Sequence, residues 1–234
     1  MKLKEFFENG DKYFLPNLSI DIVVMGYDGQ LKCLLMKNNN RWNIPGGYIG
    51  KSESINEASN RILNNLTGLQ VDNLKLLSLF GDANRNFGDQ FRVLAEENGI
   101  KWDPNCWLNS RFVSIIKYVL VNIEEVIVKG NDFYDEINWI AIDDLVDMNL
   151  DHQEIINTTL SQLRIEISDG RTCHEMLPNQ FTMPDLHQLH QVILQKKIDR
   201  SRFQKKMIGN GKFLRLPKTK TDSPGRNPFL YTPF

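Results

Sequence analysis

The sequence predicts a mixed α/β sandwich followed by a small basic domain built from two helices and a β-hairpin. Strand-like segments with alternating apolar residues are interspersed with amphipathic helical segments as far as about residue 165. This pattern changes after Ser168-Asp169-Gly170. The charge changes nearby, because the chain from Glu175 onward holds 11 Lys or Arg against 4 Asp or Glu, whereas the whole chain has a net charge of -1. We therefore expect two domains, at residues 1–168 and 169–234.

The first domain begins with a predicted pair of strands. Residues 17–27 (NLSIDIVVMGY) are rich in β-branched side chains, and residues 31–37 return after a turn. Pro45, Gly46 and Gly47 predict a loop over residues 41–50. Ser52 is expected to cap a helix from about Glu53 to Leu66, which Gly68 ends. The remaining expectations are strands at 74–80, 112–121 and 137–142, a helix at 153–165, and an insertion or long loop at 89–109, where periodicity is weak.

The second domain has the element order of a winged helix-turn-helix. Thr182 and Asp185 predict the cap of a helix that buries leucines and isoleucine. Asp199 opens a second helix, in which Phe203 and Met207 point inward, and a Gly-Asn-Gly sequence ends it. Residues 213–216 and 229–231 predict two short strands around a polar tip. Two helices followed by a β-hairpin are typical of winged-helix domains.

Composition excludes several classes of protein. The chain is 41% hydrophobic and 24% charged, which is ordinary for a globular protein. No window approaches 18 apolar residues, so we expect no membrane span and no membrane partner. The start, MKLKEFFENGDKY, lacks the apolar segment of a secretory signal. Cys33, Cys106 and Cys173 are odd in number and widely spaced, which indicates reduced thiols and a cytoplasmic location.

The most informative motif lies at residues 46–53 (GGYIGKSE) and 60–69 (NRILNNLTGL). It resembles the Nudix box, in which a glycine and a glutamate precede an arginine followed by three glutamates, a glycine and an apolar residue. The preceding WNIPG at 42–46 is similar to the usual lead-in of that family. The resemblance implies a Nudix fold for the first domain. The positions in register are Gly47, Glu53, Arg61, Leu63, Gly68 and Leu69.

The three glutamates that carry Nudix catalysis are replaced in this sequence. In the family they bind Mg²⁺ or Mn²⁺ and activate water against a diphosphate, and their positions here hold Ile62, Asn65 and Leu66. Apolar side chains cannot bind a hard cation, and a neutral amide adds no charge. We therefore expect no catalytic residue, no metal and no cofactor. The remaining Glu53 and Arg61 resemble an ion pair that stabilises the fold.

Carboxylates from elsewhere could in principle be recruited to the cleft. Glu57 precedes Arg61 by four residues, and Asp82 and Asp89 lie in a segment that could approach it. A helix-surface ion pair and solvated loop acids explain these three residues without any catalytic role. We prefer that interpretation.

An inert Nudix cleft can still serve as a sensor of a small molecule. Trp42 is placed to stack on a sugar or a base, while polar and basic residues could bind hydroxyls or phosphates. Each also has a structural interpretation, such as core packing for Trp42 and an ion pair for Arg111. The effector-binding candidates are Asp21, Trp42, Asn43, Arg85, Arg111 and Lys117.

The basic domain predicts contact with double-stranded DNA. Cations of its second helix project away from the buried Phe203 and Met207, as in a recognition helix, and further cations lie at the hairpin tip, as in a wing. His187 and His190 on the first helix lack a third ligand and are interpreted as structural or exposed. The DNA-binding candidates are Arg200, Arg202, Lys205, Lys206, Lys218, Lys220 and Arg226.

From about Phe14 to Tyr231 the chain resembles the Nudix-related transcriptional regulators, that is, the NrtR family and its sugar-responsive relatives such as the arabinose regulator AraR. Beyond the Nudix box, the likeness includes residues 177–178, 181–182, 199–206 (DRSRFQKK), 225–226 and 229–231. It implies a homodimeric, effector-controlled regulator, often a repressor of catabolic or NAD-related operons. The implied effector is a free pentose or an ADP-ribose-like nucleotide.

Three functions remain open at this level. The preferred one is an effector-responsive DNA-binding regulator, because a Nudix box without its catalytic glutamates precedes a basic winged helix. A Nudix hydrolase of nucleoside diphosphate derivatives is the alternative, with the tail serving dimerisation or substrate binding. A protein-interaction module that uses the inert cleft is the third. The sequence identifies neither the effector nor the operator, and it does not indicate whether the effector releases DNA or promotes its binding.

Overall fold

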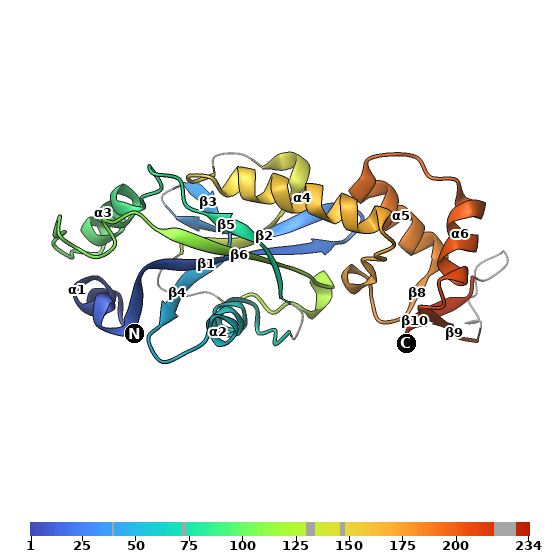
Figure 1. Ribbon diagram of the computed structural model, residues 1–234, viewed down its shortest axis with the longest axis horizontal. Helices are drawn as coiled ribbons and strands as arrows, with labels where there is room; N and C mark the ends of the chain where they lie inside the picture. Colours follow the sequence, from blue (N-terminus) through green and yellow to red (C-terminus); the bar gives the residue numbers. More distant parts are fainter. Residues whose placement is uncertain (39, 72–73, 130–133, 146–147, 218–227) are drawn as a thin grey trace.

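A mixed β-sheet forms the middle of the molecule, with one long helix on each face (Figure 1). The computed structural model describes residues 1–38, 40–71, 74–129, 134–145, 148–217 and 228–234. Strands β1 and β6 run parallel, and the other pairs are antiparallel. The main path across the sheet is β3 (Arg41–Asn43), β2 (Leu31–Asn38), β1 (Phe14–Tyr27), β6 (Val113–Leu120) and β5 (Lys75–Phe80), while β4 (Gly46–Gly50) pairs with β1 and β7 (Glu136–Ala141) with β2.

Side chains of β1 alternate between two hydrophobic cores. Ile20, Ile22 and Val24 pack with helix α2 (Ile55–Thr67), and Val23 and Met25 pack with helix α4 (His152–Ser168). This alternation follows from the two-residue repeat of a strand. Odd-numbered residues of β1 therefore face α4, and even-numbered residues face α2.

Helix α2 is present as expected, but its cap is Ser54, so the prediction of Ser52 was wrong. The Ser54 hydroxyl accepts a hydrogen bond from the Glu57 N–H at 3.2 Å, and the Glu57 carboxylate accepts one from the Ser54 N–H at 2.7 Å. This reciprocal pair is a capping box, which only Ser54 can form with Glu57. Glu53 lies outside the helix. Gly68 ends α2 in the left-handed conformation, as predicted.

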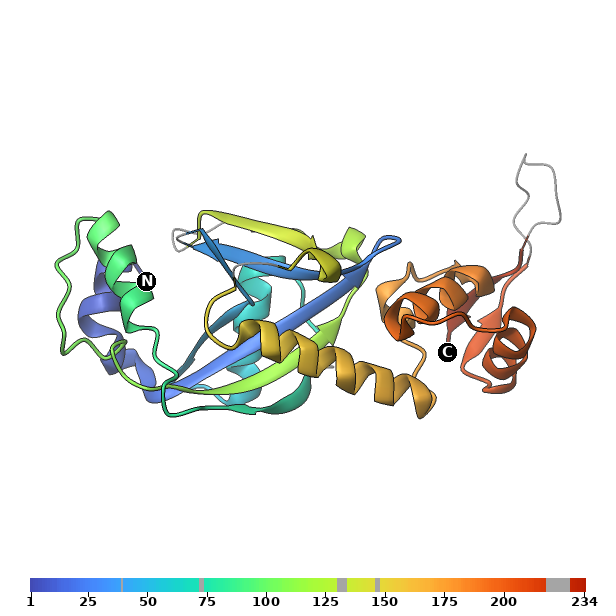
Figure 2. The same ribbon diagram turned by 90° about the horizontal axis from the view of Figure 1, so that it is seen from above.

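Two segments expected to be irregular contain regular structure. Residues 41–50 supply β3 and β4, because their backbone groups pair with β2 and β1. The expected loop at 89–109 holds most of helix α3 (Gly88–Glu97). Helix α1 (Leu3–Tyr13), which the sequence analysis did not predict, lies beside α3 at one end of the molecule (Figures 1 and 2). Both helices are stabilised by packing against each other in one hydrophobic cluster. Its buried members are Phe6, Phe7, Leu94, Ala95 and Leu108.

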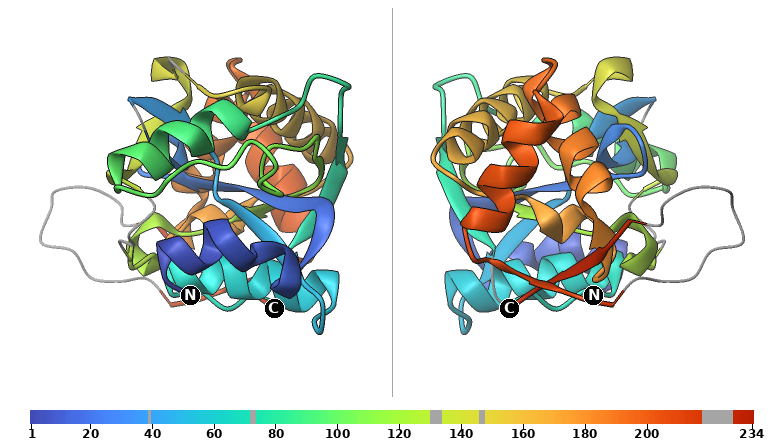
Figure 3. Two further views of the ribbon diagram at one scale, coloured as in Figure 1. Left: turned by 90° about the vertical axis from the view of Figure 1, so that its left-hand side faces the viewer. Right: turned by 90° about the vertical axis from the view of Figure 1, so that its right-hand side faces the viewer.

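The C-terminal domain lies at the opposite end of the molecule and has the predicted helices and hairpin (Figures 2 and 3). Thr182 and Asp199 cap its two helices, as expected. A short strand before the first helix, which was not predicted, joins the hairpin in a sheet of order β8-β10-β9. The elements are β8 (Phe181–Thr182), α5 (Met183–Leu194), α6 (Arg200–Gly209), β9 (Phe213–Arg215) and β10 (Leu230–Pro233).

Helix α4 joins the two domains. Near its end, the Arg164 Nε donates a hydrogen bond to the Ile193 carbonyl of α5 at 2.9 Å. Three short 3₁₀ helices, Ile123–Glu125, Ile142–Asp144 and His174–Met176, complete the helical elements among the described residues. In that same part of the chain, no helix combines the length and apolar character needed to cross a membrane.

Candidate functional site

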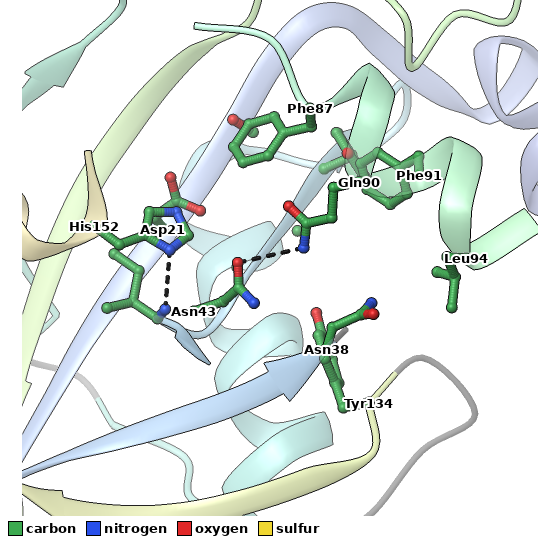
Figure 4. A pocket seen from close by; sticks show the side chains of 14 residues that line it. Asp21, Asn38, Asn43, Phe87, Gln90, Phe91, Leu94, Tyr134 and His152 are labelled. Atoms are coloured by element: carbon green, nitrogen blue, oxygen red, sulfur yellow. Dashed lines mark hydrogen bonds between the residues drawn. The ribbon is translucent and has the colours of Figure 1, made fainter. Parts of the chain in front are cut away.

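A cavity of about 80 Å³ lies at the end of the sheet nearest α3 (Figure 4). Its polar lining comes from Ser19, Asp21, Asn38, Asn43, Gln90 and His152. Its apolar lining includes Phe87, Phe91 and Leu94 from the segment that contains α3, with Tyr48 and Tyr134 nearby. A few polar groups among aromatic side chains are typical of small-molecule sites.

The polar part of the cavity rests on a buried ion pair between Asp21 and Arg85. The Arg85 Nη2 donates to the Asp21 Oδ2 at 2.9 Å, and the Arg85 Nε donates to the Asp151 Oδ2 at 2.8 Å. Phe87 covers the guanidinium at 4.9 Å. A Cβ at Gly46 would lie 2.3 Å from the Asp21 Oδ1, so only glycine leaves room for this carboxylate.

His152, the first residue of α4, forms part of the cavity wall and is 3% exposed. Its Nδ1 accepts a hydrogen bond from the Ile44 N–H at 3.3 Å, so the neutral ring carries its proton on Nε2. Burial lowers the pKa of His152, which keeps the ring neutral. The Nε2 is buried and has no hydrogen-bond partner among the described residues.

An amide cluster ties the cavity wall together. The Asn43 Oδ1 accepts hydrogen bonds from the Asn149 Nδ2 at 3.0 Å and from the Gln90 Nε2 at 3.4 Å. These three residues come from β3, from the segment before α4 and from α3. Small movements of α3 or α4 would therefore change the shape of the cavity.

A second cavity of about 280 Å³ adjoins the first and lies over α2. Its lining includes Ile62, Asn65 and Leu66, the residues that the sequence resemblance predicts at the positions of the Nudix glutamates. Ile62 and Leu66 are buried in the core, and a Cβ at Gly47 would lie 2.9 Å from the Ile62 Cγ1. These side chains do not fit Mg²⁺ or Mn²⁺, which prefer carboxylate and water oxygens. No group of three or more His, Cys, Asp or Glu in the described parts of the chain could hold a metal ion.

The predicted Glu53–Arg61 pair is present beside this cavity. The Arg61 Nη2 lies 2.6 Å from the Glu53 Oε1, and it also donates to the Tyr48 carbonyl at 2.8 Å. The Glu53 Oε1 accepts the Gly50 N–H at 2.6 Å. These bonds lower the pKa of Glu53, chiefly through the hydrogen bond from Arg61. The pair links α2 to β4.

The structure brings three of the six predicted effector residues together. Asp21 and Asn43 line the first cavity, and Arg85 holds Asp21 in place. Lys117 lies on the opposite face of the sheet, where its Nζ donates to the Asn56 Oδ1 of α2 at 2.7 Å.

Trp42 and Arg111 also lie outside the described lining of both cavities. Trp42 is half-buried against the α4 core, with the Lys37 ammonium 5.5 Å from its ring. Arg111 is exposed and donates to the Gly81 carbonyl. His152 could not be predicted from the sequence, because no sequence pattern marks its contact with Ile44, which lies 108 positions away.

A basic surface covers the outer side of α6. Phe203 and Met207 are buried, as predicted. Arg200, Arg202, Lys205 and Lys206 are exposed and make no ion pair with any described residue. The other DNA-binding candidates, Lys218, Lys220 and Arg226, lie outside the described residues. His187 and His190 make hydrogen bonds within the C-terminal domain. The His187 Nε2 donates to the Ile198 carbonyl at 2.9 Å, and the His190 Nε2 donates to the Thr172 carbonyl at 2.6 Å.

The fold defines a class of protein in which a Nudix domain is followed by a winged helix. Residues 173–232, which include both helices and the hairpin of the C-terminal domain, match the family model described as the NrtR DNA-binding winged helix domain. The predicted resemblance to Nudix-related regulators of the NrtR type is thereby confirmed.

Three relatives illustrate this similarity. A protein of Acinetobacter baylyi named "ADPR responsive transcriptional repressor NtrR" is 21% identical over 209 residues, which cover 85% of this chain and 75% of that protein. The crystal structure of Shewanella oneidensis NrtR complexed with a 27mer DNA matches with a TM-score of 0.69 and 21% identity over 93% of each chain. A MutT/nudix family protein from Enterococcus faecalis matches with a TM-score of 0.66 and 20% identity, covering 95% of this chain and 88% of that one. At these identities, the two structures establish the shared fold.

Proposed function

We propose that this protein is an effector-responsive DNA-binding transcriptional regulator that acts as a repressor. In this proposal residues 1–168 sense a small molecule and residues 169–234 bind operator DNA. The observation that carries it is the match of residues 173–232 to a DNA-binding winged-helix family, together with the exposed cations of α6. The Acinetobacter relative is named a transcriptional repressor, which supports the proposal that this regulator also represses transcription.

Helix α6 is the proposed recognition helix. Its buried Phe203 and Met207 fix which side faces outward, so Arg202 and Lys205 are free to reach phosphates and base edges. An arginine that binds guanine through two hydrogen bonds contributes about 1–3 kcal/mol of discrimination. Lys218, Lys220 and Arg226 are the proposed wing contacts. A homodimer would place two such helices on the half-sites of a palindromic operator in the cytoplasm.

The Nudix domain is proposed to bind without catalysing hydrolysis. Ile62 and Leu66 stand at positions where the resemblance implies metal ligands, and both are buried in the core. We therefore infer that the cleft binds a small molecule without activating water for hydrolysis. The Glu53–Arg61 pair then has a structural role, because it joins α2 to β4.

The charge of the cavities favours a neutral, hydroxyl-rich effector such as a pentose over an ADP-ribose-like nucleotide. A diphosphate is bound where cations, metal ions or helix N-termini face its oxygens. Among the described lining residues of both cavities, Arg61 is the single Lys or Arg, and Glu53 already neutralises it. The amides, Asp21 and the aromatic rings suit hydroxyls and a sugar face. Because the name of the Acinetobacter relative describes it as ADPR responsive, ADP-ribose is the compound against which the pentoses should be compared.

A DNA-binding titration tests the proposal. The full-length protein is titrated against a labelled fragment from the region upstream of its own gene, at two salt concentrations, with and without L-arabinose, D-xylose and ADP-ribose. We expect a specific, salt-sensitive complex whose affinity one of the sugars changes by about 5–150-fold. Folded protein that binds no such DNA would overturn the proposal. Mg²⁺-dependent turnover of ADP-ribose would instead establish the hydrolase.

A further inference from the structure

We propose that the Nε2–H of His152 donates a hydrogen bond to an oxygen of the bound neutral sugar, and that helix α4 carries this contact to the DNA-binding domain. The inference rests on the proposed function, since it assigns the residue that reads the effector in that site. It also assigns the element that connects the site to the winged helix. Neither the spacing of the sequence nor the Nudix motif marks this residue.

The hydrogen bonding of His152 leaves one ring nitrogen free for a ligand. Its Nδ1 is already an acceptor for the Ile44 N–H, and burial lowers its pKa, so the ring is neutral and Nε2 carries the proton. A buried donor without a partner is costly, and proteins retain one where a ligand or an ordered water completes it. The ring of His152 forms part of the wall of the 80 Å³ cavity (Figure 4).

The polar groups around this donor suit the hydroxyls of a sugar. Asp21 lines the same cavity and can only accept hydrogen bonds, while Asn43 and Gln90 carry amides. A donor beside acceptors is the arrangement that neighbouring hydroxyls of a sugar satisfy, because each hydroxyl both donates and accepts. An apolar effector would leave the His152 proton unpaired.

The position of His152 in the fold links the cavity to the C-terminal domain. It is the first residue of α4, whose 17 residues span about 25 Å. The other end of that helix is fixed to the C-terminal domain in two ways. Arg164 donates to the Ile193 carbonyl of α5, and Glu166 binds Arg171, which in turn binds Glu175 at 3.1 Å. A shift at His152 is therefore delivered to α5 through one rigid element.

Three variants of the full-length protein test both parts of the inference. Sugar affinity is measured by calorimetry with the pentose to which the wild type responds, and DNA affinity is measured with and without that sugar. For His152→Phe, which keeps a ring but removes the donor, we expect sugar binding about 10–100-fold weaker. His152→Gln supplies an amide donor and is expected to recover part of that loss. For Arg164→Met combined with Arg171→Met, which removes both links between α4 and the C-terminal domain, we expect unchanged sugar affinity but a DNA response reduced by at least half.

Glu154→Gln is the matched control, because this exposed side chain lies on α4 but outside both contacts. It should leave sugar binding and the DNA response as in the wild type. If His152→Phe binds the sugar as the wild type does, the recognition role is overturned. If the variant that combines Arg164→Met with Arg171→Met responds fully, the role of α4 is overturned. A wild-type protein that binds DNA but responds to neither pentose overturns the proposed sugar effector, and this inference with it.

Discussion

Asp21 and Arg85 form an ion pair at 2.9 Å in which the arginine side chain is 1% exposed, and the same guanidinium binds Asp151 directly before α4. This relationship connects the middle of β1 to the start of the helix that leads to the winged helix. Removing Arg85 would leave the Asp21 carboxylate buried and unpaired, whereas removing Asp21 would leave Arg85 with Asp151 alone. The pair thus stabilises the N-terminal domain, and its Asp21 also forms part of the floor of the candidate effector cavity.

The first prediction concerns this pair. Asp21→Asn should reduce the free energy of unfolding by about 1–3 kcal/mol, because Arg85 would lose the more buried of its two carboxylate partners and keep Asp151. Chemical denaturation followed by circular dichroism measures the change. Asp28→Asn is the matched control, since its pair with Lys32 lies at the surface, with the Asp28 side chain 44% exposed, and contributes at most about 1 kcal/mol. Equal losses in the two variants would contradict the importance assigned to burial.

A second prediction separates the two serines before α2. Ser54→Ala should cost about 1 kcal/mol in the free energy of unfolding, because it removes the capping box with Glu57. Ser52→Ala should change stability by less than about 0.5 kcal/mol. Thermal and denaturant unfolding of both variants provide the measurement. A larger cost for Ser52→Ala would restore the cap that the sequence analysis favoured.

The third prediction concerns the proposed recognition helix. Arg202→Ala with Lys205→Ala should weaken DNA binding and reduce the slope of log affinity against log salt by about 0.9 for each phosphate that the variant no longer neutralises. Lys101→Ala, an exposed cation in the N-terminal domain, serves as the control. Fluorescence anisotropy at four salt concentrations gives both slopes. An unchanged slope in the double variant would argue that α6 does not face the phosphates.

The fourth prediction is a pH dependence that arises in the winged-helix domain. Burial lowers the pKa of His190 below its ordinary value of 6.5, and the Thr172 carbonyl accepts from the neutral ring. The unfolded chain therefore binds this proton more readily than the folded one. The contribution of the neutral His190 to the free energy of unfolding is fully present above pH 6.5. It should be lost as the pH falls from 6.5 through the lowered pKa of the folded state. His190→Gln should flatten this part of the profile of unfolding free energy between about pH 5 and 7. A profile as steep as that of the wild type would rule out His190 as its source.

Much of the fold could be predicted because each core face repeats locally. The apolar face expected for α2 comprises Ile55, Ala58, Ile62, Leu63 and Leu66, and all of these except Ile55, at the start of the helix, are buried. The cap was misplaced by two residues although the Ser-x-x-Glu pattern from Ser54 was present in the sequence. Helices α1 and α3 escaped prediction because each is stabilised mainly by the aromatic side chains of the other and of the segment between α3 and β6.

The candidate site was less predictable, because it depends on pairing between distant segments. Lys117 and Asp21 both lie on central strands, but the register pairs Asp21 with Ile116, which sends the Lys117 side chain to the other face. A shift of one residue in this register would have reversed that outcome. The environment of His152 likewise arises only when α4 docks beside β3 and β4, through contacts that no local pattern encodes.

Helices α1 and α3 enclose a hydrophobic cluster that is separate from the two cores flanking the sheet, at the end of the molecule remote from α6. Phe6 and Phe91 belong to this cluster and also line the cavity over α2. Substitutions there can reshape the roof of the cleft while the sheet and the winged helix keep their packing. In the proposed regulator, evolution can thus change which molecule is sensed without changing which DNA sequence is bound.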